Sequence, residues 1–320
     1  MKRVKVLLLV MAVLLVSGVS HAQDYPARPI RLIVPMGTGG GTDLIARAVV
    51  AKIADGLGKA VVVENKAGGG GDMGIELVAK AKPDGYTLLM ASATYLVRAG
   101  MYKVPYDPVR DFAPVTQVSA APYAIVVNAS LPAKSVSEFV AYAKANPGKI
   151  NFGSQGNGSL VHLIGELIKA NCGINMVHVP YKGAGAAFTD LLANQVQLGI
   201  LTLPSALPYT KSEKLRALAV TGEKRAKAAP DLPTMAEAGI KNFVVTQWQG
   251  LLAPKDTPRP IVDRLNREVL KVLLQGDVAK NLAEEGAEIV GSSPQQFEAL
   301  IKADYEKWVK LIKQAGIRAE

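Results

Sequence analysis

Two glycine-rich segments of the chain have the residue types of an anion-binding turn. In the first, an apolar run over residues 30–34 leads through Pro35 to Gly40, Gly41, Thr42 and Asp43. In the second, the run is Gly153-Ser154-Gln155-Gly156-Asn157-Gly158-Ser159, and a segment with helical periodicity follows it. Glycine allows a sharp turn and a close approach of the backbone, and Ser, Thr and Asp favour the position that begins a helix. The first N–H groups of a helix have no intrahelical partner and lie at its positive end. Each segment therefore predicts a strand, a turn and a helix N-terminus that hold an anion such as a carboxylate.

The second segment also allows a different chemistry, that of a serine hydrolase. Phe152-Gly153-Ser154-Gln155-Gly156 nearly matches G-x-S-x-G, except that Phe152 replaces the first glycine. The alternative enzyme would use Ser154 or Ser159 with His162, although Ser159 and His162 are held only one helical turn apart. We interpret His162 as a packed histidine of the second turn and His178, in a predicted strand, as structural. We expect no catalytic residue.

Residue types elsewhere argue against other classes of function. Outside the N-terminal segment, His162, His178 and Cys172 are the only histidine and cysteine residues. We therefore expect no metal site, and we interpret Cys172 as structural. Residues 69–74 fit G-x-G-x-x-G but lack an acidic residue about twenty positions later, so no dinucleotide cofactor is expected. The formal net charge is +10 and the charges are scattered, so we expect no nucleic-acid partner.

Alternating strands and helices position these segments. Apolar runs separated by helical periodicity indicate βαβ units and a mostly parallel sheet, in which ligands bind outside the carboxyl ends of the strands. Ser92 and Thr94 follow the predicted strand 86–91, and Tyr181 and Lys182 follow the predicted strand 176–179. Lys182 is a candidate partner for an acidic ligand. Asp190 either faces the ligand or lies on a helix surface.

The order of the elements predicts two domains. Domain 1 comprises residues 23–118 and 248–320, and domain 2 comprises residues 119–247. Separate strands are predicted over residues 113–118 and 123–128, and the chain crosses between the domains near 115–118 and 246–249, which would form a hinge. With 49% hydrophobic residues the chain can fill sizeable cores.

Residues 1–22 have the pattern of a secretory signal peptide. Lys2, Arg3 and Lys5 precede an apolar run over residues 6–16, and Ser20-His21-Ala22 resembles a cleavage site. The apolar run is short for a membrane anchor, which is the alternative. We expect cleavage before Gln23 and localisation in the periplasm.

Several motifs in this order resemble the substrate-binding receptors of tripartite tricarboxylate transporters, the Bug-type periplasmic receptors. The matching stretches, which cover nearly all of the chain after residue 22, are Tyr25-Pro26-Ala27-Arg28-Pro29-Ile30-Arg31-Leu32-Ile33-Val34-Pro35, Gly39-Gly40-Gly41-Thr42-Asp43, Val63-Glu64-Asn65-Lys66-Ala67-Gly68, Pro83-Asp84-Gly85-Tyr86-Thr87-Leu88, Gly153 to Ser159, His178-Val179-Pro180-Tyr181-Lys182-Gly183, Asp231-Leu232-Pro233-Thr234 and Glu237-Ala238-Gly239. Met36-Gly37-Thr38 departs from the family, in which an aromatic residue and a proline often precede the glycines.

The resemblance implies an α/β, two-domain periplasmic-binding-protein type II fold with a ligand cleft between the domains. It implies that the two glycine-rich turns grip a carboxylate through backbone amides, hydroxyls and waters. Carried over residue by residue, the ligand-binding positions are Gly40, Gly41, Thr42, Asp43, Ser154, Gly156, Gly158 and Ser159, with Ser92, Thr94, Tyr181, Lys182 and Asp190 at the sides. The expected function is a non-enzymatic receptor, monomeric and without cofactor, that passes a small carboxylate to membrane permease subunits. A receptor that serves a membrane sensor is a further alternative.

Overall fold

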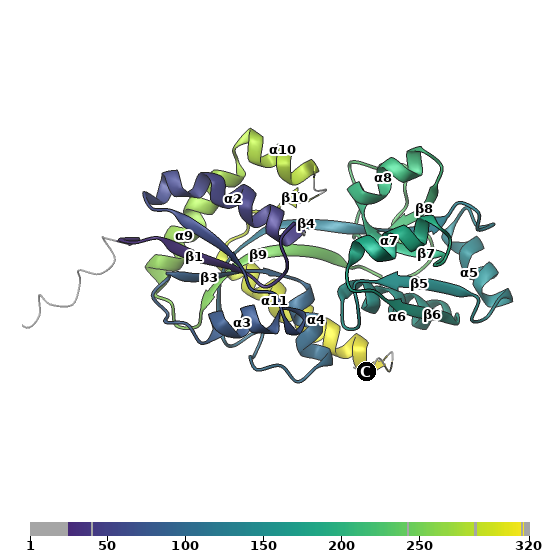
Figure 1. Cartoon of the computed structure of the whole chain (residues 1–320), viewed down its shortest axis with the longest axis horizontal. Coiled ribbons are helices and arrows are strands. Elements are labelled where there is room, and N and C mark those ends of the chain that lie inside the picture. The colour runs from purple at the N-terminus through teal and green to yellow at the C-terminus, as the bar shows by residue number, and fades with distance from the viewer. Residues whose placement is uncertain (1–24, 40, 242, 285–286, 315, 317–320) are drawn as a thin grey trace, which may run out of the picture.

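The chain folds into two lobes that share two long strands (Figure 1). The computed structural model describes residues 25–39, 41–241, 243–284, 287–314 and 316, so the predicted signal peptide lies outside the described residues. We call the elements before β4 and after β9 the first lobe, and the elements between β4 and β9 the second lobe. Within the described residues, no helix is long and apolar enough to cross a membrane.

The first lobe is a βαβ arrangement completed by the C-terminal helices. Its elements are β1 (Ile30–Val34), α2 (Gly41–Leu57), β2 (Val61–Asn65), the short 3-10 turn η1 (Gly69–Gly71), α3 (Asp72–Ala79), β3 (Thr87–Ser92), α4 (Thr94–Met101), α9 (Arg259–Leu273), α10 (Gly276–Glu284), β10 (Glu288–Ile289) and α11 (Pro294–Gln314). Strands β2, β1 and β3 are parallel neighbours. The residues that follow their carboxyl ends therefore lie along one edge of the sheet.

The second lobe repeats this pattern with its own strands and helices. Its elements are α5 (Val136–Ala145), β5 (Ile150–Ser154), α6 (Leu160–Cys172), β6 (Met176–Pro180), α7 (Ala184–Leu192), β7 (Leu198–Thr202), α8 (Leu203–Lys211) and β8 (Leu215–Val220). Strand β5 is parallel to β6 and β7. Ser135 accepts a hydrogen bond from the Glu138 amide at the start of α5, as a good N-cap residue does.

Strands β4 (Phe112–Asn128) and β9 (Thr246–Pro254) connect the lobes. They pair in antiparallel fashion from Phe112↔Pro254 to Pro122↔Thr246, and the strand order is β2-β1-β3-β9-β4-β7-β5-β6. The prediction of separate strands over 113–118 and 123–128 was wrong, because Pro122 does not interrupt β4. The pairing shifts register at two places along β4 instead, which lets a single strand bend from one lobe to the other.

The cores follow from this layout. One apolar cluster lies between the first-lobe sheet and helices α2 and α9, and it includes Leu32, Val49 and Leu265. A second cluster runs through both lobes and contains Trp248 of β9, which is 1% exposed. A third lies beneath α7 and α8. The α/β prediction is confirmed. The sheet is mixed, however: β1 pairs in parallel with β2 and β3, and β5 with β6 and β7, whereas every pair that involves β4 or β9 is antiparallel. The expectation of a mostly parallel sheet was therefore wrong, because the two strands that connect the lobes run opposite to their neighbours.

Candidate functional site

The first glycine-rich turn, the loop between β1 and α2, is held by a buried carboxylate. Asp43 is 1% exposed and lies in the first turn of α2. Its carboxylate accepts hydrogen bonds from the Gly39 amide at 2.9 Å, from Arg47 Nε at 3.0 Å and from Asn65 Nδ2 at 2.9 Å. Asn65 also donates to the Met36 carbonyl at 3.1 Å. The carboxylate therefore ties the turn that follows β1 to Asn65, the last residue of β2.

The charge of Asp43 is compensated inside this network. Burial alone would raise the pKa of the carboxyl, but the hydrogen bonds from Arg47, the Gly39 amide and Asn65 together lower it below its usual range. Thr42 is buried beside Asp43, and Gly41 is exposed at the start of α2. Gly40 lies outside the described residues. The described part of the turn thus presents the exposed N-terminus of α2. The Asp43 carboxylate beside it is ionised, and Arg47 balances its charge.

The second glycine-rich turn, the loop between β5 and α6, is held by histidines. Ser154 Oγ lies 2.7 Å from His178 Nε2 and 3.0 Å from the Gly156 carbonyl oxygen, and it accepts a hydrogen bond from the Gly156 amide at 3.1 Å. The Gly158 amide donates to His162 Nδ1 at 3.3 Å. Ser159 caps α6 by accepting a hydrogen bond from the His162 amide at 3.2 Å. Gly156 and Gly158 have φ values of 118° and 75°, which favour glycine.

The remaining predicted residues of the second lobe follow β6 or lie on α7. The Tyr181 hydroxyl donates to Asp190 Oδ2 at 2.6 Å. Burial, and then this hydrogen bond and the carboxylate charge, raise the pKa of Tyr181 to about 12. In this structure Asp190 therefore accepts a hydrogen bond from Tyr181, a residue of the same lobe. Lys182 is exposed, and within the described residues it forms no ion pair.

Ser92 ends β3 and belongs to a buried polar group that the sequence did not mark. It is 3% exposed and lies opposite Gln249 of β9, whose Oε1 accepts a hydrogen bond from Ser119 Oγ at 2.9 Å. Gln247 lies two residues before Gln249, so it projects from the same face of β9. Among the described residues, the buried Oε1 of Gln247 has no hydrogen-bond partner. Thr94 lies two residues after Ser92, at the start of α4, and is half-buried.

The two lobes touch beside the second turn. A Cβ at Gly158 would overlap Cε2 of Tyr102, which follows α4 in the first lobe. The Arg98 guanidinium lies over the Tyr102 ring, 4.7 Å from its centroid. Arg98 in turn donates to Asp72 with Nε at 3.1 Å and Nη2 at 2.7 Å, and Tyr106 donates to the same carboxylate at 3.1 Å. The second turn therefore abuts a braced part of the other lobe.

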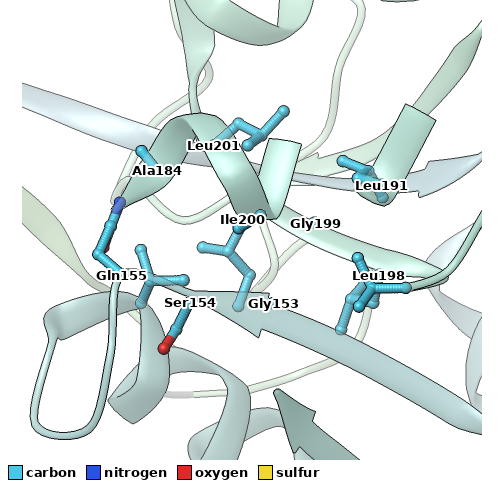
Figure 2. A pocket seen from close by; sticks show the side chains of 12 residues that line it. Gly153, Ser154, Gln155, Ala184, Leu191, Leu198, Gly199, Ile200 and Leu201 are labelled. Carbon is cyan, nitrogen blue, oxygen red and sulfur yellow. The ribbon is translucent and has the colours of Figure 1, made fainter. Parts of the chain in front are cut away.

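A small pocket lies behind the second turn, between β5, β7 and α7 (Figure 2). Apolar side chains such as Ile200 and Leu198 line most of it, and Figure 2 shows the Ser154 oxygen directed away from them. Its volume of about 20 Å³ has room for roughly one water molecule. A dicarboxylate does not fit there, so this pocket is not the candidate ligand site.

The structure contains a serine–histidine contact of the kind that the hydrolase alternative requires, but the histidine is His178 and not His162. Ser154 contacts His178, whereas Ser159 accepts a hydrogen bond from the His162 backbone amide at the cap of α6. Ser154 is 1% exposed, and its single hydroxyl proton is directed to His178 or to the Gly156 carbonyl. A buried hydroxyl engaged in this way is poorly placed to attack a substrate. Among the described residues, no group of three or more His, Cys, Asp or Glu side chains is arranged to hold a metal ion.

Comparison with known proteins places these features in a family. The chain is 37% identical over 300 residues to the protein BugT of Bordetella pertussis, covering 93% of this chain and 92% of BugT. The solved structure of the periplasmic binding protein BugD has a TM-score of 0.81 and 37% identity, covering 92% of this chain and all of BugD.

Two further solved structures contain dicarboxylates. The Rhodopseudomonas palustris protein Rpa4515 with adipate has a TM-score of 0.83 and 36% identity, and the match covers 92% of this chain and 99% of Rpa4515. MatC from Rhodopseudomonas palustris with bound malate has a TM-score of 0.80 and 31% identity, covering 90% of this chain and all of MatC.

These similarities show that the chain is related to binding proteins and not to hydrolases. The solved neighbours are periplasmic binding proteins, which confirms the predicted fold, and they are not enzymes, which goes against the hydrolase alternative. The family model described as the tripartite tricarboxylate transporter family receptor matches residues 45–317. The chain therefore belongs to the receptor family of the tripartite tricarboxylate transporters.

Proposed function

We propose that this solute receptor binds a small dicarboxylate between the two glycine-rich turns and delivers it to the membrane permease subunits of a tripartite transporter. The relatives with adipate and malate support the ligand class. The main observation in favour of this proposal is that each turn leads into a helix N-terminus. Buried side chains hydrogen-bond to each turn: Asp43 in the first lobe, and His162 and His178 in the second. N–H groups fixed in this way can hold a carboxylate without a large ordering cost.

The side chains around the turns would complete the site. Within this proposal Lys182 supplies a mobile positive charge, and Thr94, Tyr181 and Asp190 line the side. Ser159 contributes mainly as the cap of α6. Gln247 offers a carbonyl oxygen without a partner among the described residues, which a ligand hydroxyl or a bound water would satisfy.

Domain closure is part of the proposal. We assign residues 23–118 and 248–320 to domain 1 and residues 119–247 to domain 2, with the hinge where β4 and β9 pass between the lobes. The bend of β4 at its register shifts supports a hinge there. Residues 1–22 would direct the chain to the periplasm as a cleaved signal peptide. We expect a monomer. A receptor for a membrane sensor is the second use that the same binding site would serve.

A thermal-shift screen with small carboxylates, followed by calorimetry, tests the ligand class. The panel contains adipate, malate and the diamide of each acid. An acid present at a hundred times its Kd stabilises the protein by about 2.7 kcal/mol, which is a measurable rise in Tm. We expect at least one acid to stabilise the protein and its diamide to have no effect. Equal effects of acids and diamides, or no effect of any acid, would contradict the proposal.

A pair of lysine variants refines the test. Lys182→Gln removes a charge beside the second turn, whereas Lys149→Gln removes an exposed charge next to the amino end of β5, the opposite end from Ser154. Both change the net charge equally, so long-range attraction of an anion falls alike. Only Lys182→Gln should weaken binding of the acid further. Equal effects of the two substitutions would remove Lys182 from the site.

A further inference from the structure

Three aromatic rings from three different elements form a stack beneath the second turn. The imidazole of His178, from β6, lies on that of His162, from α6, with ring centroids 3.9 Å apart and planes inclined by 11°. Phe152, from β5, also stacks on His178, with ring centroids 4.9 Å apart and planes inclined by 29°. The stack therefore ties the strand before the turn to the helix after it.

Each imidazole reaches a different end of the turn. His178 Nε2 contacts Ser154 Oγ, at the last residue of β5, at 2.7 Å. His162 Nδ1 accepts the hydrogen bond of the Gly158 amide, just before α6, at 3.3 Å. Gly156, midway between them, is held in turn by Ser154 Oγ. The pair thus fixes the path of the backbone from residue 154 to residue 158.

The hydrogen bond from the Gly158 amide requires an uncharged His162 ring. Nδ1 of His162 can accept a hydrogen bond only while it carries no proton, so the ring is neutral when the Gly158 bond is made. Burial, followed by the charges of His162 and Lys169, lowers the pKa of His178 to about 4. Lys169 of α6 is itself paired with Glu166 at 2.8 Å, and β5 contains no titratable residue.

We propose that His162 and His178 are positioning residues, which hold the second turn in the conformation that presents its backbone N–H groups to the ligand carboxylate. The inference rests on the proposed function of this turn. It also changes the role expected for Ser154, whose hydroxyl proton is directed to His178 or to the Gly156 carbonyl and so is not available to a ligand. Ser154 then stabilises the turn, and the backbone amides bind the ligand carboxylate.

Paired substitutions separate the hydrogen bonds from the packing. Asn at position 162 and Gln at position 178 carry an amide that can take the place of Nδ1 and Nε2 respectively and does not titrate, whereas Leu fills space without a hydrogen bond. We expect His162→Leu and His178→Leu each to weaken binding of adipate about tenfold, the effect of one lost hydrogen bond. His162→Asn and His178→Gln should stay within about threefold of the unsubstituted protein.

Phe152→Leu is the matched control for packing, because it removes one ring of the stack without touching a hydrogen bond of the turn. We expect it to lower Tm and to leave adipate affinity unchanged. If the Asn and Gln variants are as weak as the Leu variants, or if Phe152→Leu weakens binding equally, stacking alone acts and the inference is wrong.

Amide hydrogen exchange of residues 155–158 provides a readout that needs no ligand. We expect faster exchange in this stretch for the two Leu variants and unchanged exchange for the Asn and Gln variants, with α5 as an internal reference. Failure of the unsubstituted protein to bind adipate would count against the proposed function with this probe, while the exchange data would still decide the positioning role. Unchanged exchange in the Leu variants would overturn it.

Discussion

Replacement of Gly158 by alanine tests whether contact between the lobes controls binding. Gly158 has φ of 75°, and a Cβ there would overlap Cε2 of Tyr102 and lie 3.1 Å from its hydroxyl oxygen and 3.2 Å from Cζ. Because Arg98 lies over the Tyr102 ring and is bound to Asp72, the ring has little freedom to swing aside. The substitution should therefore push the lobes apart.

The expected size of the effect has two parts. Alanine at a positive φ costs about 1–2 kcal/mol, and this part lowers the stability of the second lobe whatever the lobes do. The ring must also withdraw by about 1 Å before its carbon atoms reach an ordinary contact distance. If the lobes separate to relieve this overlap, its cost falls only on the form in which Gly158 and Tyr102 are in contact. We expect about a tenfold loss of dicarboxylate affinity, equivalent to about 1.4 kcal/mol.

A double-mutant cycle with Tyr102→Ala isolates the overlap. In the double variant the overlap is gone but the backbone strain remains, so affinity should recover more than Tm does. Calorimetry gives Kd, thermal unfolding gives Tm, and small-angle scattering gives the radius of gyration with and without ligand. Additive effects of Gly158→Ala and Tyr102→Ala on Kd, together with an unchanged radius of gyration, would refute the reasoning.

Three further outcomes are expected. Asp43→Asn removes the partner of Arg47 from the first turn and should reduce the free energy of unfolding by about 2 kcal/mol, measured by urea denaturation. A change below about 0.5 kcal/mol would mean that the network does not hold the turn. Because the pKa of His178 is about 4 when folded and about 6.5 when unfolded, the unfolded chain binds more protons between these values. Stability should therefore fall by up to about 3 kcal/mol as pH drops from 6.5 to 4, and His178→Gln should flatten that part of the pH profile. Tyr181→Phe removes the hydrogen bond to Asp190 and should lower stability by about 1 kcal/mol with little change in Kd, whereas a tenfold loss of affinity would place the hydroxyl on the ligand.

The local elements of the fold could be predicted from the sequence because their signals are local. The apolar run over residues 30–34 and the glycines that follow it form β1 and the first turn, and Ser159 caps α6 as its type suggests. Strand β4 could not be predicted as one element, because Pro122 separates the predicted strands 113–118 and 123–128. Pro114 and Pro122 are both accommodated where β4 pairs with β9, and one register shift begins at Pro114.

The interior of the candidate site depends on contacts that residue spacing does not reveal. His178 reaches Ser154 across 24 positions, and Asn65 reaches Asp43 across 22. The hydrolase alternative pairs Ser154 with His162 because these two residues are close in sequence, whereas the contact of Ser154 with His178 forms only in the fold. The signal that could have indicated this contact is the parallel pairing of β5 with β6. That pairing places Ser154 opposite Pro180 and Phe152 opposite His178, so His178 lies close to the end of β5.

The two turns share a division of roles between side chain and backbone. In each, polar side chains turn inward and bind one another: Asp43 with Arg47 in the first, and Ser154 with His178 in the second. Backbone N–H groups at a helix N-terminus recognise negative charge but not the remainder of a molecule. We infer that the turns fix the carboxylate and that discrimination among acids falls to the buried polar face of β9. Gln247→Leu should then change the ranking of malate against adipate more than the affinity for either, because only malate has a hydroxyl to donate to its Oε1. Calorimetry with the two acids measures that ratio, and an unchanged ratio would place discrimination elsewhere in the site.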